Sequence, residues 1–404
     1  MNAPQFLRMS LVTAYALLAS CAPQSTRPLP PVPRPTAASI NSGDLRTRLY
    51  IYADDSMMGR EAGTMGNLKA TSYIGAEAAR IGLEPAGDSG TYFQDIRATS
   101  TRFSGASIPG SARNVIAVLR GSDPALRNEY VAIGAHNDHL GIRPTAVDHD
   151  SLRAVNLQLQ RLGGADRRNR ARRDSLRSTI RVNMDSLRHI RRSRLDSIAN
   201  GADDDGSGTV TVLEIAEALA AMPVKPKRSV IFVWHTAEEK GLLGSKWFTD
   251  HPTVPRESIV AQLNVDMVGR GSAEDIAGGG PDYLQLVGSR RVSTELGDLV
   301  EQINSSRARP FKFDYTFDAN GHPERIYCRS DHYNYARYNI PITFFTTGLH
   351  PDYHQVTDEP QYIDYEHLTR IATFVQDVAL KVANLDHRLK VDKPVADPTG
   401  ACVQ

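Results

Sequence analysis

Acidic residues and histidines recur in five short segments that follow apolar runs or lie in glycine-rich or proline-flanked loops. The segments are GAHNDHLG (134–141), GADDDGSG (201–208), HTAEEKG (235–241), NVDMVG (264–269) and DYHQVTDE (352–359). Two divalent ions about 4 Å apart need roughly five such ligands, one of them a carboxylate shared by both ions, and a further carboxylate can serve as a base. The segments supply that inventory: the expected ligands are His136, Asp204, Glu239, Asp266 and His354, with Glu238 left over as the base.

Asp266 is the most informative of these carboxylates. It lies in the apolar run LNVDMV (263–268), where an ionised aspartate is costly unless it is paired or bound to a metal. His136 follows another apolar run and precedes Asp138 by two positions. Because a metal-bound histidine usually donates its second N–H to a carboxylate, we expect Asp138 to orient His136.

Three consecutive aspartates, 203–205, precede a glycine-serine turn. Their charges would repel one another in a bare surface loop, and cations held between them would offset that repulsion. A helix N-cap formed by Asp205 or Ser207 is a simpler explanation of the cluster, and it is compatible with Asp204 binding metal.

Apolar runs of strand length alternate with helical patterns around these motifs. This alternation predicts an α/β fold with a mostly parallel, mixed central sheet flanked by helices and with the ligands at strand ends. A glycine at position 82 is expected to end the second helix. The expected strands are 114–119, 130–135, 229–235, 261–268, 283–287 and 340–346, and the expected helices are two within 43–82 and one each at 209–222, 241–250, 291–305 and 365–385.

Residues 148–199 interrupt this alternation with an arginine-rich insert. Apolar residues at helical spacing stop at Gly163-Gly164 and resume further on, which predicts a helical hairpin whose ends return near His136 and Asp204; a disordered charged segment is the alternative. Its arginines are interleaved with aspartates and the formal net charge is only +1, so we expect no nucleic-acid partner. The apolar stripe of the insert offers a possible contact for an oligomer.

The first 21 residues resemble a targeting segment. A short apolar run that ends in Leu18-Ala19-Ser20-Cys21 matches a bacterial lipobox and is too short to span a bilayer; an ordinary cleaved signal peptide is the alternative. Residues 22–42 form a proline-rich tether, and residues 391–404 a C-terminal tail. The expected location is the bacterial cell envelope, with a lipid on Cys21 anchoring the protein in the outer membrane facing the periplasm. Cys328 and Cys402 could pair, but we favour free thiols.

The five motifs, in this order, resemble those of the co-catalytic zinc aminopeptidase family, which includes bacterial leucyl aminopeptidases and, more distantly, glutamate carboxypeptidase and glutaminyl cyclase. The resemblance covers residues 43–390, the expected catalytic domain of zinc exopeptidase type, apart from the insert. It departs from the family at Asn137, where a tyrosine is common.

The resemblance also assigns roles. It implies two zinc ions, one bound by His136 and Asp266 and the other by Glu239 and His354. Asp204 would bridge the two ions and form a cis peptide with Asp205, and Glu238 would be the general base. The oxyanion would be stabilised by a tyrosine, for which both Tyr353 and Tyr327 match patterns found in the family.

These expectations describe a lipid-anchored zinc exopeptidase that removes N-terminal residues from peptide substrates. A carboxypeptidase or a glutaminyl cyclase on the same fold is the alternative among enzymes. A carboxypeptidase needs cationic groups around the substrate carboxylate, and Arg325 and Arg329 could supply them. A metal-free binding module of this fold is the alternative outside enzymes.

Overall fold

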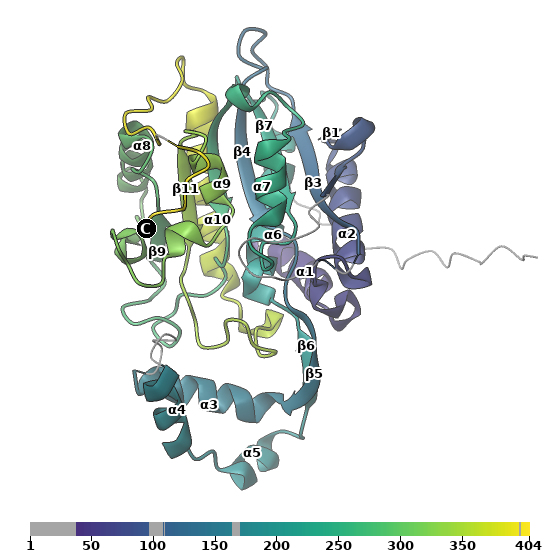
Figure 1. The fold of residues 1–404 in the computed structure, drawn as a ribbon, viewed down its shortest axis with the longest axis vertical. Helices are drawn as coiled ribbons and strands as arrows, with labels where there is room; N and C mark the ends of the chain where they lie inside the picture. Colours follow the sequence, from purple (N-terminus) through teal and green to yellow (C-terminus); the bar gives the residue numbers. More distant parts are fainter. Residues whose placement is uncertain (1–37, 97–107, 109, 164–169, 396) are drawn as a thin grey trace, which may run out of the picture. The chain divides into compact units, whose positions relative to one another are not determined.

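A mixed sheet forms the centre of this computed structural model, which describes residues 38–96, 108, 110–163, 170–395 and 397–404 (Figure 1). Within these residues the sheet has nine strands in the order β1-β3-β7-β4-β8-β11-β9-β10, with β2 also paired to β3. The strands are β1 (Glu84–Pro85), β2 (Phe93–Ile96), β3 (Ala112–Leu119), β4 (Tyr130–His136), β7 (Ser229–His235), β8 (Ile259–Val265), β9 (Tyr283–Val287), β10 (Lys312–Asp314) and β11 (Ile342–Thr346).

The middle strands of the sheet run parallel to one another, and the strand on either side of them runs antiparallel. Strands β7, β4, β8 and β11 run parallel to one another, whereas β3 pairs antiparallel with β7 and β9 antiparallel with β11. Every residue of β4, β7 and β8 is buried, as expected for parallel strands with both faces covered. The predicted α/β fold with a mixed sheet is therefore confirmed.

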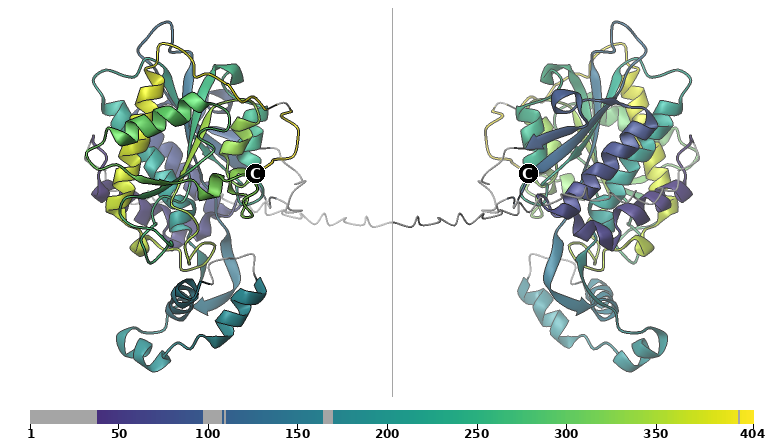
Figure 2. Two further views of the ribbon diagram at one scale, coloured as in Figure 1. Left: turned by 90° about the vertical axis from the view of Figure 1, so that its left-hand side faces the viewer. Right: turned by 90° about the vertical axis from the view of Figure 1, so that its right-hand side faces the viewer.

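Helices cover both faces of this sheet (Figure 2). The larger apolar core includes side chains from α1 (Ser42–Tyr52), α2 (Met65–Ile81), α6 (Gly208–Ala221), α8 (Thr294–Ser305) and α10 (Tyr365–Ala383). The second core, on the opposite face, includes side chains from α7 (Leu243–Asp250) and α9 (His332–Ala336). Gly82 ends α2 in the left-handed region, with φ of 85°, so the predicted stop is confirmed.

The insert differs from the predicted helical hairpin. It is a two-stranded antiparallel ribbon, β5 (Gly141–Asp148) and β6 (Leu195–Ala199), that carries α3 (His149–Arg161), α4 (Arg170–Thr179) and α5 (Met184–Ile190) (Figure 1). The insert does contain the predicted helices, and α3 contacts α4. The ribbon was not predicted, because its strands lie some 50 residues apart and show no local hairpin signal. Gly141 pairs with Ala199, so the ends of the insert meet beside the ligand motifs, as expected.

The C-terminal tail is tied to the sheet domain. Cys328 and Cys402 form a disulfide across 74 residues, so the preference for free thiols was wrong; the sequence separation gave no sign that the two residues meet. The Gln404 side chain accepts a hydrogen bond from the Tyr327 N–H at 3.0 Å. The predicted signal segment (1–21) and residues 22–37 of the tether lie outside the described residues. Among the helices that the structure describes, none has the length and apolar character of a membrane span.

Candidate metal centre

The ligand motifs meet at the carboxyl ends of the parallel strands. His136 is the last residue of β4, Asp266 directly follows β8, and the Glu238-Glu239 pair follows β7. Asp204 lies in the turn before α6, and His354 lies in the loop between β11 and α10. Side chains from five separate segments therefore converge at one edge of the sheet, where open α/β sheets place their sites.

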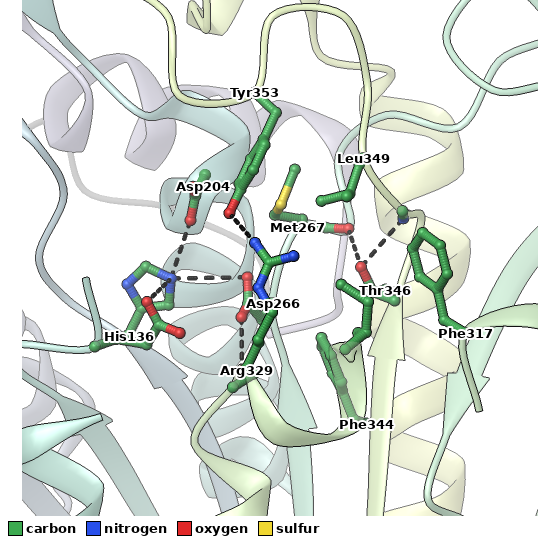
Figure 3. A pocket seen from close by; sticks show the side chains of 14 residues that line it. His136, Asp204, Asp266, Met267, Phe317, Arg329, Phe344, Thr346, Leu349 and Tyr353 are labelled. Atoms are coloured by element: carbon green, nitrogen blue, oxygen red, sulfur yellow. Dashed lines mark hydrogen bonds and ion pairs between the residues drawn. The ribbon is translucent and has the colours of Figure 1, made fainter. Parts of the chain in front are cut away.

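Asp204 lies between two groups of side chains. Its Oδ1 is 3.0 Å from His136 Nε2, which is itself 3.7 Å from Asp266 Oδ1 (Figure 3). Its Oδ2 is 3.1 Å from His354 Nε2, which is also 3.1 Å from Glu239 Oε2. The two oxygens of one carboxylate thus face two different histidine–carboxylate pairs, which is the arrangement that a bridging ligand requires.

Glu238 stands apart from the pair that faces His354. Its Oε2 is 4.0 Å from His136 Nε2, and its side chain lines the pocket beside the site. Burial raises the pKa of this carboxyl well above its usual range, as do Glu239 and Asp266, although His136 opposes the shift. Asp138 supports both residues. Its Oδ1 accepts the Glu238 N–H at 3.0 Å, and its backbone carbonyl oxygen lies 3.1 Å from His136 Nδ1, closer than its carboxylate Oδ1 at 3.7 Å.

His139 belongs to the site although the sequence did not single it out. Its ring is fully buried, and its Nδ1 lies 2.8 Å from Glu239 Oε1 and 3.7 Å from Asp204 Oδ2. Burial and Asp204 raise the pKa of Glu239, but His354 and His139 outweigh them and hold it at about 2. A second histidine three residues after His136 was the available signal, and its proximity to Glu239 could be seen only in the fold.

The donor set fits divalent cations such as zinc. Two groups of buried side chains could each hold an ion, His136–Asp204–Asp266 and His139–Asp204–Glu239. Within the described structure, Asp204 Oδ2 and Glu239 Oε1 are buried and form no hydrogen bond, although imidazole nitrogens lie 3.1 and 2.8 Å away. Imidazole nitrogens and carboxylate oxygens are the usual ligands of zinc in sites of this kind. The carboxylates of Asp204, Glu239 and Asp266 lie buried close together, and their negative charges need compensating positive charge, which bound cations would supply.

The neighbours of Asp204 fix the turn that presents it. Asp205 Oδ2 accepts the His136 N–H at 2.9 Å, and its Oδ1 accepts the N–H of Gly208, at 2.9 Å, in the first turn of α6. The N-cap residue of α6 is Ser207, whose side chain makes no cap hydrogen bond, and it is Asp205 that accepts a backbone N–H at the start of the helix, while Asp204 is directed into the site. The peptide bond between the two aspartates is cis, as the family resemblance implied.

Three residues of the ligand motifs have unfavourable backbone conformations. Ala237 (φ 55°), Met267 (φ 57°) and His354 (φ 59°) lie in the left-handed region, which non-glycine residues seldom adopt. Ala237 precedes Glu238, Met267 follows Asp266, and His354 is itself a predicted ligand. Such strain persists where surrounding structure imposes it and is concentrated at functional sites.

A pocket opens beside the two groups. Its apolar side includes Met267, Phe344 and Leu349, and Figure 3 shows Arg329 and Tyr353 pointing toward one another at its rim. Arg329 Nη2 donates to the Tyr353 hydroxyl at 3.0 Å. Tyr327 lies elsewhere, packed under the Arg291 guanidinium at 4.1 Å from its ring centroid. Of the two candidate tyrosines, only Tyr353 lines this pocket.

The insert contacts the loop that carries His354. Arg143 in β5 donates to the backbone carbonyl of His354, and Arg153 in α3 forms an ion pair with Asp352. Asp352 is fully buried and also lies 3.3 Å from a guanidinium nitrogen of Arg270. Two arginines of the insert therefore help to fix the position of a predicted metal ligand.

Comparison with known proteins places part of the chain beside a peptidase family. Residues 183–379 match the model of Peptidase family M28, a segment that includes every predicted ligand except His136. Leucine aminopeptidase 1 of Aspergillus fumigatus is 29% identical over 196 residues, which cover 46% of this chain and 47% of that protein. The chain thus matches this curated relative over about half of its length.

Solved structures share the fold at low sequence identity. A leucine aminopeptidase precursor from Bacteroides thetaiotaomicron superposes with a TM-score of 0.56 at 16% identity, covering 86% of this chain and 98% of that one. Glutaminyl cyclase from Porphyromonas gingivalis superposes with a TM-score of 0.55 at 17% sequence identity, and the match covers 85% of this chain and 98% of that one. The fold is that of the zinc exopeptidases. The predicted family resemblance is confirmed by these matches.

Proposed function

We propose that this protein is a metal-dependent exopeptidase that removes N-terminal residues from peptides with two bridged zinc ions and a glutamate base. The observation that carries the proposal is the position of Asp204, whose two oxygens lie 3.0 and 3.1 Å from imidazole nitrogens of two separate groups. His136 and Asp266 would hold one ion, and Glu239 and His354 the other. His139 is close enough to Glu239 to orient its carboxylate.

The side chains divide the chemistry among them. Bound zinc would polarise the scissile carbonyl and lower the pKa of a water molecule toward neutrality. Glu238 would take a proton from that water and deliver it to the leaving amine. The Tyr353 hydroxyl would donate a hydrogen bond to the developing oxyanion, and Arg329 would hold that hydroxyl in place.

The pocket suggests the kind of side chain that is accepted. Met267, Phe344 and Leu349 present an apolar wall beside the expected ions. An apolar side chain at the N-terminus of a substrate would therefore bind more favourably when it is buried against this wall than when it is exposed to water. Peptides with such residues at the N-terminus are the proposed substrates.

Arg329 supports a second candidate. A guanidinium in the pocket suits a substrate carboxylate as well as a polarised carbonyl, which is the contact that a carboxypeptidase needs. A glutaminyl cyclase on this fold is the further alternative, and a metal-free binding module is disfavoured because the predicted ligand set is intact and assembled.

The location proposed from the sequence is the bacterial cell envelope, with the protein anchored to the outer membrane through a lipid on Cys21. The disulfide between Cys328 and Cys402 supports it, because such bonds persist in oxidising compartments outside the cytosol. No nucleic-acid partner is proposed. A second copy docking through the insert remains a hypothesis.

A peptide panel tests the function. Leucyl dipeptides with a free amine, their N-acetylated forms, their C-terminal amides and a glutaminyl peptide are assayed before and after chelation and zinc restoration. We expect release of the N-terminal residue only from substrates with a free amine, lost on chelation and restored by zinc. Cleavage that survives N-acetylation but not C-terminal amidation would establish a carboxypeptidase. Ring closure of glutamine without peptide cleavage would establish a cyclase.

A further inference from the structure

A second group of potential ligands lies where the insert meets the His354 loop. It consists of His149, the first residue of α3, Asp196 in β6, and Glu359, five residues after His354. One nitrogen or oxygen atom from each lies within 4.8 Å of the others. Glu359 is the last residue of the DYHQVTDE segment. None of the three is a predicted ligand of the candidate metal centre, and the proposed exopeptidase function does not use them.

His149 is presented as a metal ligand would be. Its side chain is 1% exposed, its Nδ1 lies 3.4 Å from Asp150 Oδ1, and its ring stacks on Tyr362. Its Nε2 has no hydrogen-bond partner in the described structure and lies 4.0 Å from Glu359 Oε1. A carboxylate on one ring nitrogen and a free second nitrogen facing a carboxylate is the arrangement of a metal-bound histidine.

The two carboxylates in the group need a cation or a proton between them. Burial raises the pKa of Glu359 to about 7, with a further contribution from Asp196 that Arg194 opposes. Arg194 Nη2 lies 3.3 Å from Glu359 Oε1, but its side chain is 45% exposed and can turn toward water. Arg194 therefore compensates part of the charge and leaves the nitrogen of His149 without a partner.

We propose that His149, Asp196 and Glu359 bind a divalent transition-metal ion such as zinc at a site separate from the catalytic one. One imidazole and two carboxylates are suitable zinc ligands, with water completing the coordination. Because His149 and Asp196 lie at the two ends of the insert and Glu359 follows the His354 loop, the ion fastens the insert to that loop.

Zinc counting on the full-length protein tests the proposal. The wild type, His149→Gln, Asp196→Asn and the control His189→Gln, on exposed α5, are stripped, reloaded with excess zinc and desalted. We expect one zinc ion fewer per chain in the first two variants than in the wild type and the control. This difference does not depend on how many ions the catalytic site holds, so failure of the proposed function would change only the absolute count.

Two further measurements keep the test decisive if a variant folds poorly. Anomalous scattering at the zinc edge from wild-type crystals should give a peak among the three side chains. Arg194→Gln should keep the additional zinc ion, because the arginine is not a ligand. Equal zinc counts in the wild type and in folded His149→Gln, or no peak at this position, would overturn the proposal and leave the group as a proton-sharing ion-pair cluster.

Discussion

Glu238 and Glu239 are adjacent in the chain but have different surroundings. Glu239 faces Asp204, His139 and His354, whereas Glu238 lies nearer to His136 and lines the pocket. We expect Glu238→Gln to keep both metal ions and lose about 10²–10⁴-fold in kcat, the usual effect of removing a general base. Glu239→Gln, as the matched variant, should lose one ion.

Metal analysis beside kinetics decides between these roles. If Glu238→Gln lost an ion while Glu239→Gln retained both, the two assignments would have to be exchanged.

The two candidate tyrosines also differ in position. Tyr353 lines the pocket, and its hydroxyl accepts a hydrogen bond from Arg329. Tyr327 is buried against Arg291. Tyr353→Phe should therefore lower kcat by about 10²-fold or more while leaving KM nearly unchanged, as expected when a transition-state hydrogen bond is lost. Tyr327→Phe serves as the control, and a larger kcat loss in that variant would reverse the assignment.

At the scale of single residues, the sequence predicted Asp204 and the four other ligand candidates that lie around it. Each lies in a short motif beside an apolar run, and residue type alone limits which side chains can bind zinc. His139 and the choice between the tyrosines could not be predicted. Both depend on contacts between residues far apart in the chain, such as His139 with Glu239 and Arg329 with Tyr353.

The insert and the His354 loop act together at the scale of elements. Because Arg153 is paired with buried Asp352 and Arg143 with the carbonyl of His354, removing either arginine should loosen a metal ligand. We expect Arg153→Gln to speed the release of one zinc ion to a chelator about 10-fold, as is typical when support behind a ligand is lost. The control is Arg177→Gln on exposed α4, and equal release rates would show that the insert does not position the loop.

The contact between α1 and α6 should make stability depend on pH. Burial raises the pKa of Glu214 in α6 from 4.5 to about 7, although Arg48 opposes the shift. Between these two pH values the folded chain binds more protons than the unfolded chain. The stabilisation that protonated Glu214 gives the folded chain is therefore fully present below pH 4.5 and is lost as the pH rises through 7. This contribution to the free energy of unfolding is at most about 3 kcal/mol.

Glu214→Gln should therefore weaken the decline in unfolding free energy between pH 5 and 8. Denaturant unfolding of this variant, the wild type and the control Glu366→Gln, which changes an exposed side chain, measures the effect. Identical pH profiles for all three proteins would contradict the prediction.

Sequence patterns predicted the elements of the core better than those of the insert. Continuous apolar runs produced β4 and β7, because strands covered on both faces contain few polar residues. The strand β5 reads GIRPTAVD, a mixed run with an internal proline. Its partner β6 follows three helices later, so local periodicity could not reveal the pairing, and only the helices between them were foreseen.

At the scale of the whole molecule, two cysteines bear on where the protein resides. Cys328 and Cys402 join the tail to the sheet domain across 74 residues, and closing a loop of that length contributes about 4 kcal/mol when it forms under oxidising conditions. Cys21 lies in the lipobox-like segment, outside the described residues. A protein that needs the disulfide for stability and carries a lipid on Cys21 would have to be exported before it is fully stable.

Fractionation of cells that express the full chain tests the anchor. The wild type should sediment with membranes and carry the mass of acyl chains on its N-terminal cysteine. Cys21→Ser should move to the soluble fraction with its peptidase activity intact, because one or two acyl chains supply the hydrophobic area that holds such proteins to a bilayer. Cys402→Ser is the matched control: it removes the disulfide but keeps Cys21, so it should be less stable and still sediment with membranes. A wild type without acyl mass, together with unchanged fractionation of Cys21→Ser, would show that no lipid is attached at this position and leave an ordinary signal peptide as the explanation of the segment.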